Sequence, residues 1–262
     1  MKKTIISHFY NEQYLLPKWL EHYRNHFDHG VLINYNSFDD SCDIIREMCP
    51  SWEIIESEHE KFSPVTLGPQ INKIVSQIDE WKTIMNTTEF LIGDFSSLDK
   101  IHQPTSVFTH SMYMIDDRVD FFPNLHEMLT GIDNAVHYET DPSLRSMRVI
   151  HNHPIEYEAG RHFRGFPQSE NFLILYFALA PVNNHMIQRK MQIQNKIPDE
   201  EKKGRCGWQH WQSYYAEKNN FDKGYYDELD FHADVELLKS QSSNVRKIID
   251  SYLDKMNCKN VH

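Results

Sequence analysis

The composition of this 262-residue chain describes a folded protein, because 40% of its residues are hydrophobic and 13% are aromatic, too many for disorder. Its net charge of -11 argues against binding to duplex nucleic acid, which needs a basic face. Only nine residues are glycine, and they form neither a dinucleotide fingerprint nor a Walker P-loop. If this protein binds phosphate groups, it does so without a glycine-rich loop.

Neither a signal sequence nor a membrane span is expected. Met1-Lys2-Lys3 is followed by an apolar run far too short for a signal sequence. The longest apolar stretch, residues 172–182, is about half as long as a membrane span, and we interpret it as a buried helix. Four cysteines without a C-x-x-C pair indicate reduced thiols. These features predict a cytoplasmic protein.

Strands and helices alternate along the first hundred residues. β-rich segments predict strands at residues 4–9, 31–35, 52–55 and 89–92. The helical spacing of apolar residues predicts helices at residues 15–25, between Asp40 and Pro50, and at residues 69–85. This alternation is typical of a mostly parallel sheet with helices on both faces.

The pattern changes after residue 99. Short strands are expected at residues 107–115, 119–122, 136–138 and 145–150. Helices are expected at residues 172–179, 185–194, 227–238 and 245–255. The chain is therefore predicted to be an α/β protein with a core at residues 1–168 and a helical C-terminal extension at residues 169–262. The core would hold a mixed, mostly parallel sheet flanked by helices.

Three polar clusters follow expected strands, at residues 8–12, 34–40 and 93–99. In a parallel α/β sheet, ligands bind outside the carboxyl ends of the strands. Each cluster alone could simply cap the next helix, as Asn11-Glu12 or Asp39-Asp40 would. Three such clusters on one edge of the sheet favour a shared binding site.

The order of these features resembles family-two glycosyltransferases of the GT-A fold. In that family an Asn-Glu pair follows the first strand, an Asn/Asp-rich loop follows the second, and a later strand ends in D-x-D. A bacterial-type subgroup is the closer resemblance, through the block from Asn11-Glu12 to Trp19-Leu20. Residues 29–37 and 197–200 continue it. The resemblance implies a GT-A-like, Rossmann-like core that binds a nucleotide-sugar donor along its strand ends.

The resemblance also implies how the donor would be held. The first two polar clusters would bind the nucleoside, and the D-x-D acids would bind a divalent metal, Mn2+ or Mg2+, on the diphosphate. Asp94 is the first of these acids, but Ser96 replaces the second, which puts the metal in doubt. The expected donor-binding residues are His8, Tyr10, Asn11, Glu12, Asn34, Asp39, Asp94, Arg161 and His162.

Residues 151–162 concentrate three histidines, two acids and an arginine. Such a segment could simply present polar groups to water. The resemblance places a histidine that completes the metal shell here, so His151 and His153 join Asp94 as expected metal ligands. Arg161 could bind a diphosphate through two hydrogen bonds at once.

The acceptor side is less defined. An inverting transfer needs a general base for the acceptor hydroxyl. The candidates are Glu156, Glu158 and Asp117, with Asp116 beside the last, and their spacing does not choose among them. A sugar ring of the acceptor could stack on the side chains of Trp208, His210 and Trp211. These residues could equally anchor the C-terminal segment on the core.

The resulting hypothesis is a hexosyltransferase of glycan biosynthesis. It would move a sugar from a nucleotide donor, UDP-linked in the first instance, to a glycan or lipid-linked hydroxyl acceptor. Basic pairs at residues 189–190 and 202–203 could also attract an anionic glycan or a membrane surface. Two alternatives are a metal-dependent hydrolase built on the His/Asp cluster, and an inactive relative that binds a glycan or a partner. Ser96 in place of the second D-x-D acid would be compatible with an inactive relative.

Overall fold

The computed structural model describes residues 1–114, 135–137, 148–157, 161, 168–177, 185, 188–189 and 192–203. Its strands are β1 Lys3–Phe9, β2 His29–Asn34, β3 Glu53–Glu56, β4 Trp81–Ile84, β5 Glu89–Gly93, β6 Ser106–Met114, β7 Ala135–His137, β8 Val149–His151 and β9 Gln168–Tyr176. Its α-helices are α1 Leu16–Tyr23, α2 Ser41–Met48, α3 Pro64–Val75 and α6 Asp199–Lys203, and its 3-10 helices are η1 Phe95–Lys100 and η4 Ile193–Lys196.

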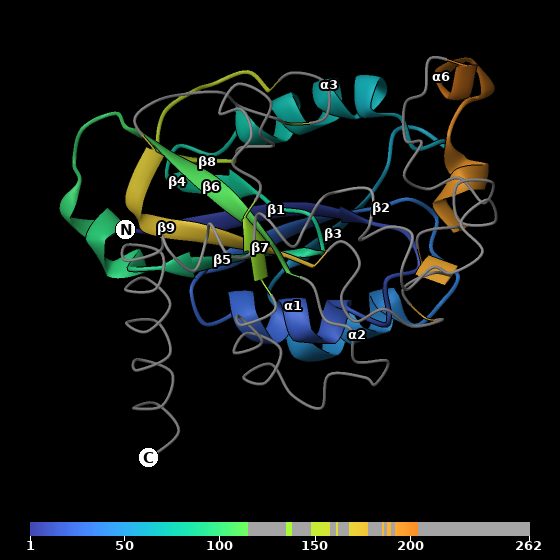
Figure 1. Cartoon of the computed structure of the whole chain (residues 1–262), viewed down its shortest axis with the longest axis horizontal. Helices are drawn as coiled ribbons and strands as arrows, with labels where there is room; N and C mark the ends of the chain where they lie inside the picture. The colour runs from blue at the N-terminus through green and yellow to red at the C-terminus, as the bar shows by residue number, and fades with distance from the viewer. Residues whose placement is uncertain are drawn as a thin grey trace.

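All nine strands of the described part join one mixed sheet, in the order β3-β2-β1-β4-β8-β6-β9-β5 with β7 paired to β6. Helices α1 and α2 lie on one face of this sheet and α3 on the other (Figure 1). The predicted α/β class, with a mixed sheet flanked by helices, is therefore confirmed.

The N-terminal half of the sheet is parallel. Strand β1 pairs in parallel with β2 and β4, and β2 pairs in parallel with β3. Within β1, Ile5 packs with the core under α1 and α2, while Ile6 packs with the core under α3. A parallel strand covered by helices on both faces is apolar on both faces, which explains the apolar start of the chain.

Strand β5 runs in the opposite direction to β1–β4. Strand β4 is antiparallel to β8, β8 to β6 and β5 to β9, whereas β6 and β9 are parallel. The strand direction therefore changes three times across the sheet between β4 and β5. As a result, β5 ends at the edge of the sheet where β1 begins. Asp99, in η1 just after β5, accordingly accepts hydrogen bonds of 2.9 Å from the amino group of Met1 and from Nζ of Lys3.

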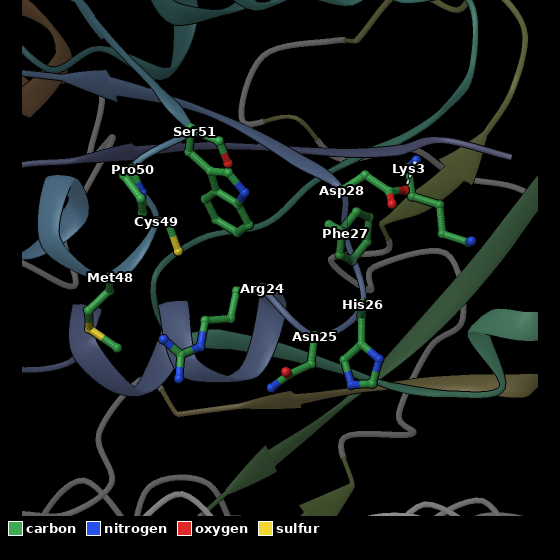
Figure 2. Close-up of a pocket in the computed structure, with 11 residues that line it drawn as sticks. Lys3, Arg24, Asn25, His26, Phe27, Asp28, Met48, Cys49, Pro50 and Ser51 are labelled. Carbon is green, nitrogen blue, oxygen red and sulfur yellow. Dashed lines mark hydrogen bonds between the residues drawn. The ribbon is translucent and has the colours of Figure 1, made fainter.

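We call the edge at which β1–β4 begin the amino edge, and the edge at which they end the carboxyl edge. A pocket of about 400 Å³ lies at the amino edge, lined by Lys3 and by residues 24–28 and 48–52. Figure 2 shows Lys3 and Asp28 on one side of it and Met48 and Cys49, at the end of α2, on the other. This pocket is thus remote from the strand ends where the sequence predicts a ligand.

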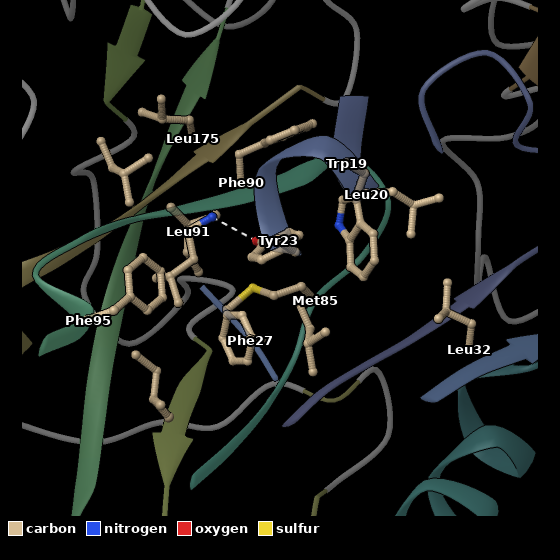
Figure 3. Close-up of a cluster of buried hydrophobic side chains, with 14 of the residues drawn as sticks. Trp19, Leu20, Tyr23, Phe27, Leu32, Met85, Phe90, Leu91, Phe95 and Leu175 are labelled. Atoms are coloured by element: carbon tan, nitrogen blue, oxygen red, sulfur yellow. Dashed lines mark hydrogen bonds between the residues drawn. The ribbon is translucent and has the colours of Figure 1, made fainter. Parts of the chain in front are cut away.

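The larger core lies between the sheet and α1. Trp19, Leu20 and Tyr23 of α1 are fully buried against strands that include β5 and β9 (Figure 3). The hydroxyl of Tyr23 donates to the backbone carbonyl of Glu89 at 2.9 Å and accepts from the N–H of Leu91 at 2.7 Å. Trp19 donates through Nε1 to the carbonyl of Asn86 at 2.9 Å. The aromatic residues of α1 therefore fix the turn between β4 and β5 as well as filling the core.

Two predicted elements are wrong. Residues 172–176, expected in a helix, belong to β9, an interior strand between β6 and β5. The first residues of the expected extension thus contribute a strand to the core sheet. Residues 81–84, expected at the end of a helix, form β4. A short, fully apolar run such as residues 172–175 has no periodicity that distinguishes a buried strand from a buried helix, which explains the first error.

The expected strands at 136–138 and 145–150 correspond to β7 and β8. The expected strand at 119–122 and the helices at 227–238 and 245–255 lie outside the described residues. None of the helices that the structure describes is long and apolar enough to cross a membrane.

Candidate functional site

Two loops interlock at the carboxyl edge, one after β1 and one after β2. The N–H of Asn11 donates to Oγ of Ser37 at 3.0 Å, and Oδ1 of Asn11 accepts from the N–H of Phe38 at 2.9 Å. Asn11 and Asn36 have φ angles of 49° and 57°, a left-handed conformation that asparagine tolerates better than most residues. The side chain of Asn11, expected to bind the donor, thus builds the loop pair.

Asn34 and Asp39 also hold the loops together. Asn34 accepts from the N–H of Ser37 at 2.9 Å and donates through Nδ2 to both carboxylate oxygens of Glu56 at 3.1 Å. Asp39 accepts from the N–H of Ser41 at 3.1 Å and from the N–H of Gln13 at 3.0 Å. Both residues lie at the expected edge, and the hydrogen bonds found for them shape its surface.

An aromatic surface lies on these loops. Phe38 is 82% exposed, and its ring meets the half-buried ring of Tyr10 edge to face at 6.1 Å. Nζ of Lys196, in η4, lies 4.6 Å from the centre of the Tyr10 ring. Single exposed phenylalanines are common on proteins, but this one continues an aromatic and cationic surface at the strand ends. Such a surface suits a planar or anionic ligand.

Arg161 reaches the end of β1 from a distant part of the sequence. Its Nη1 donates to Nδ1 of His8, so the proton of that imidazole resides on Nε2. The His8 ring stacks on Phe62 at 5.2 Å and meets the edge of Tyr35 at 6.0 Å. Arg161 itself is only 5% exposed and has a φ of 60°. The structure thus brings together His8 and Arg161, two of the expected donor-binding residues.

The charge of Arg161 lacks a carboxylate partner in the described part of the chain. The nearby acid, Glu89, instead binds Arg148 through two hydrogen bonds of 2.9 and 2.8 Å, and Arg148 also donates to the carbonyl of Arg161 at 2.7 Å. Burial alone would raise the pKa of Glu89, but Arg148 lowers it below its usual value. Burial and the repulsion of Arg148 lower the pKa of Arg161 to about 9. Its Nε has no hydrogen-bond partner among the described residues.

The other buried acid at this edge, Glu12, is also paired. Both of its oxygens accept hydrogen bonds from Arg189, with Nη2 to Oε1 at 2.6 Å, and Nη2 also donates to Oγ1 of Thr87 at 3.0 Å. Burial raises the pKa of Glu12, and Arg189 opposes that rise. Gln192 donates to the backbone carbonyls of Tyr10 at 3.2 Å and Asn11 at 2.8 Å. Glu12, expected at the donor, is thus bound within the protein.

Five residues of this edge escaped sequence reasoning. Arg189 lies in a basic pair that suggests a solvated helix face, and the other four belong to no recognised pattern. The one available signal was the three-residue spacing of Arg189 and Gln192, which places both on one side of a helix. These residues are Phe62, Arg148, Arg189, Gln192 and Lys196.

His151 is a buried structural residue. Its Nδ1 contacts the carbonyl of His153 at 2.7 Å and its Nε2 contacts the hydroxyl of Tyr157 at 3.0 Å, so both ring nitrogens are engaged. Burial lowers its pKa to about 3. His153 contacts Oγ of Ser106 through Nε2 at 2.8 Å and the carbonyl of Pro154 through Nδ1 at 3.1 Å. Neither ring has the open nitrogen that a metal would require.

Asp94 lies at the amino edge, because it follows β5. Its Oδ1 accepts from the N–H of Ser96 at 3.2 Å and from Oγ of Ser96 at 2.6 Å, and it caps η1. The expectation that three polar clusters share one edge is therefore wrong, since β5 is reversed. The fourth parallel strand is β4, and Asn86, Thr87 and Thr88 follow it at the carboxyl edge.

The divalent metal that the resemblance implies does not fit the described residues. Its expected ligands follow β5 (Asp94) and β8 (His151 and His153), which both end at the amino edge, away from the donor-binding residues after β1 and β2. Strands β6 and β9 lie between β8 and β5 in the sheet and keep the two ligand sets apart. Among the residues that the structure describes, no three metal-ligating side chains lie together.

Of the acceptor-side candidates, the structure describes only Glu156. It is exposed and precedes Tyr157, whose N–H donates to Oδ1 of Asn72 in α3 at 2.9 Å. The other candidates lie outside the described residues, namely Glu158, Asp117, Trp208, His210 and Trp211, as does the donor candidate His162.

Comparisons with known proteins give only distant similarity. No family model matches the sequence, and no curated protein is significantly similar to it. Solved structures of Staphylococcus aureus TarS 1–349, including complexes with UDP-GlcNAc and with UDP, align with a TM-score of 0.32 to 0.33 at 17% identity. The alignment to TarS 1–349 covers 45% of this chain and 37% of that one. For the longer TarS structure the shares are 47% and 23%. The chain thus matches little more than a third of TarS 1–349.

Proposed function

We propose that the carboxyl edge binds a nucleotide-sugar donor, UDP-linked in the first instance, and that the protein transfers the sugar to a hydroxyl acceptor of a glycan or lipid-linked substrate. The observation that carries this proposal is Arg161, a buried guanidinium beside His8 at the end of β1. A buried cation is costly unless an anion accompanies it. The described carboxylates near it are committed to other arginines.

The position of Arg161 supports a nucleotide rather than an isolated anion. It lies at the carboxyl ends of parallel strands, where α/β proteins bind nucleotides. Its planar fork matches the oxygens of a diphosphate. The rings of Tyr10 and Phe38 supply a surface on which a nucleobase could stack. Asn11 and Glu12, which carry the family resemblance, lie in the loop that presents Tyr10.

The proposed reaction is a displacement at the anomeric carbon of the sugar. The acceptor oxygen forms a bond to that carbon, and the bond from the carbon to the diphosphate oxygen breaks. Its electron pair leaves with the nucleoside diphosphate, whose charge Arg161 would stabilise. The hydroxyl proton passes to a base, for which Glu156, Glu158 and Asp117 stay candidates.

Calorimetry on the full chain with UDP, GDP, ADP and uridine tests the binding step. We expect one nucleoside diphosphate to bind at micromolar concentration and Arg161→Gln to weaken it. Arg46→Gln, which alters an exposed arginine on α2 that pairs with Asp43, is the matched control and should bind normally. Absence of binding by every nucleoside diphosphate would contradict the proposal.

A second candidate function is ligand binding without transfer. Ser96 stands where the family resemblance calls for the second D-x-D acid, and this favours an inactive relative. Release of UDP from UDP-sugars, with and without glycan acceptors, distinguishes the two. Binding without any turnover supports this second candidate.

A further inference from the structure

Buried charges at the carboxyl edge do not cancel within the described part of the chain. Two acids are present, Glu12 and Glu89, and each is held by both oxygens on one arginine. A third arginine, Arg161, lies 5% exposed with no described acid paired to it. The buried side chains described at this edge therefore carry one surplus positive charge.

The same edge offers little to a divalent cation. The residues after β4 supply an amide and two hydroxyls, Asn86, Thr87 and Thr88, which bind such ions more weakly than carboxylates do. Asp39 at the neighbouring loop already accepts two backbone N–H groups. A divalent ion bound at this edge would also be repelled by the charge of Arg161.

We infer that the site holds the diphosphate of its ligand through the Arg161 guanidinium, oriented by His8, and that this binding needs no divalent metal ion. The inference rests on the proposed nucleotide-sugar binding and names the group that neutralises the diphosphate. Arg161 has the geometry for this role because Nη1 is fixed on Nδ1 of His8, which sets the plane of the fork. His8 is a positioning residue in turn fixed by its stacking on Phe62.

The test measures the affinity of the full chain for UDP, or for whichever nucleoside diphosphate binds best, in EDTA and in Mn2+ or Mg2+. We expect the two dissociation constants to agree within about twofold, and the diphosphate to bind at least about tenfold more tightly than the free nucleoside in EDTA. Inorganic pyrophosphate should compete in EDTA.

Arg161→Gln should weaken diphosphate binding by about 10- to 100-fold and leave nucleoside binding unchanged. The diphosphate affinity of Arg161→Lys should lie between that of Arg161→Gln and that of the natural chain, because lysine keeps the charge but cannot donate two parallel hydrogen bonds. His8→Ala should weaken the diphosphate less than Arg161→Gln does, since it removes only the orienting contact. Thermal melting of each variant checks that it folds.

The outcomes separate this inference from the proposed function. Diphosphate binding that requires Mn2+ or Mg2+ would overturn the inference and leave the proposed function standing. Equal affinity for the nucleoside and its diphosphate in EDTA would also overturn it, without relying on any variant. Failure of all nucleotides to bind, with or without metal, would overturn the proposed function itself.

Discussion

The Glu12 carboxylate binds the Arg189 guanidinium, 177 residues further along the chain, with both side chains buried. This pair joins the segment that contains η4 and α6 to the loop after β1. Gln192 and Lys196 add contacts to the same loop. Figure 1 shows this segment at the end of the sheet opposite to the N-terminus. The Glu12–Arg189 pair therefore holds residues near the two ends of the described chain together.

Glu12→Gln should destabilise the protein strongly. It leaves Arg189 buried without its counter-charge, a change that costs about 3–5 kcal/mol of unfolding free energy in other proteins. Urea denaturation measures the loss, and the double variant Glu12→Gln/Arg189→Met should recover much of it because no charge stays buried. Asp43→Asn, which breaks the exposed Arg46–Asp43 pair, is the control and should change stability little. Equal losses of unfolding free energy in Glu12→Gln and Asp43→Asn would show that the buried pair does not stabilise the fold.

Phe38→Ala should weaken nucleotide binding without destabilising the fold. The ring is 82% exposed, so its removal loses little buried surface. If a base stacks on it, the affinity should fall by about 5- to 100-fold, the range found for base–aromatic stacking. Titration of the variant with the nucleotide that binds the natural chain gives the ratio. An unchanged dissociation constant would place the base elsewhere.

The sequence was sufficient for the N-terminal parallel layer and for one side of the site. The strand–helix alternation correctly predicts β1, α1, β2, α2 and β3, because each has a clear apolar period and a turn or cap after it. The polar residues after β1 and β2 were correctly expected at one edge, since consecutive parallel strands end on the same side.

The direction of β5 could not be predicted from the sequence. It depends on β8, β6 and β9, which come later in the chain and insert between β4 and β5 in the sheet. The five residues of β5 have the same sequence pattern whether the strand is parallel or antiparallel, so Asp94 was assigned to the wrong edge. The pairing of Arg189 with Glu12 was equally hidden, because nothing local to residue 189 marks a partner near the N-terminus.

Gly30→Ala should destabilise the protein far more than Gly68→Ala. A Cβ at Gly30 would lie 2.2 Å from the Trp52 ring, which is buried against β2 and cannot move without disturbing the core, so a loss of about 1–3 kcal/mol is expected. Outside α3 itself, a Cβ at Gly68 meets nothing closer than the Tyr157 carbonyl at 3.8 Å. Alanine there gains helix propensity, but its Cβ also faces the ring of Pro69, so the net change should stay below about 1 kcal/mol. Thermal unfolding of both variants measures the contrast, and equal losses would contradict the close packing of Trp52 on Gly30.

The stability of the protein should fall between about pH 6.5 and pH 4, in part because of His22. Burial lowers the pKa of His22 from 6.5 to about 4, and its Nε2 donates to the carbonyl of Leu91 at 2.8 Å. In this window the unfolded chain binds a proton that the folded chain does not, so the free energy of unfolding decreases as the pH falls. The contribution of this one residue is on the order of 3 kcal/mol.

His22→Gln isolates that contribution. The glutamine amide can keep a hydrogen bond to Leu91 but does not titrate, so its unfolding free energy should fall less steeply from pH 6.5 to 4 than that of the natural chain. His151, whose pKa burial also lowers, titrates equally in both proteins and cancels from the comparison. His102→Gln alters an exposed histidine and should keep the natural slope. Urea denaturation across the pH series gives the slopes. If His22→Gln and His102→Gln lose stability in parallel, another group causes the acid sensitivity, and His22 is either solvated or already charged in the folded protein.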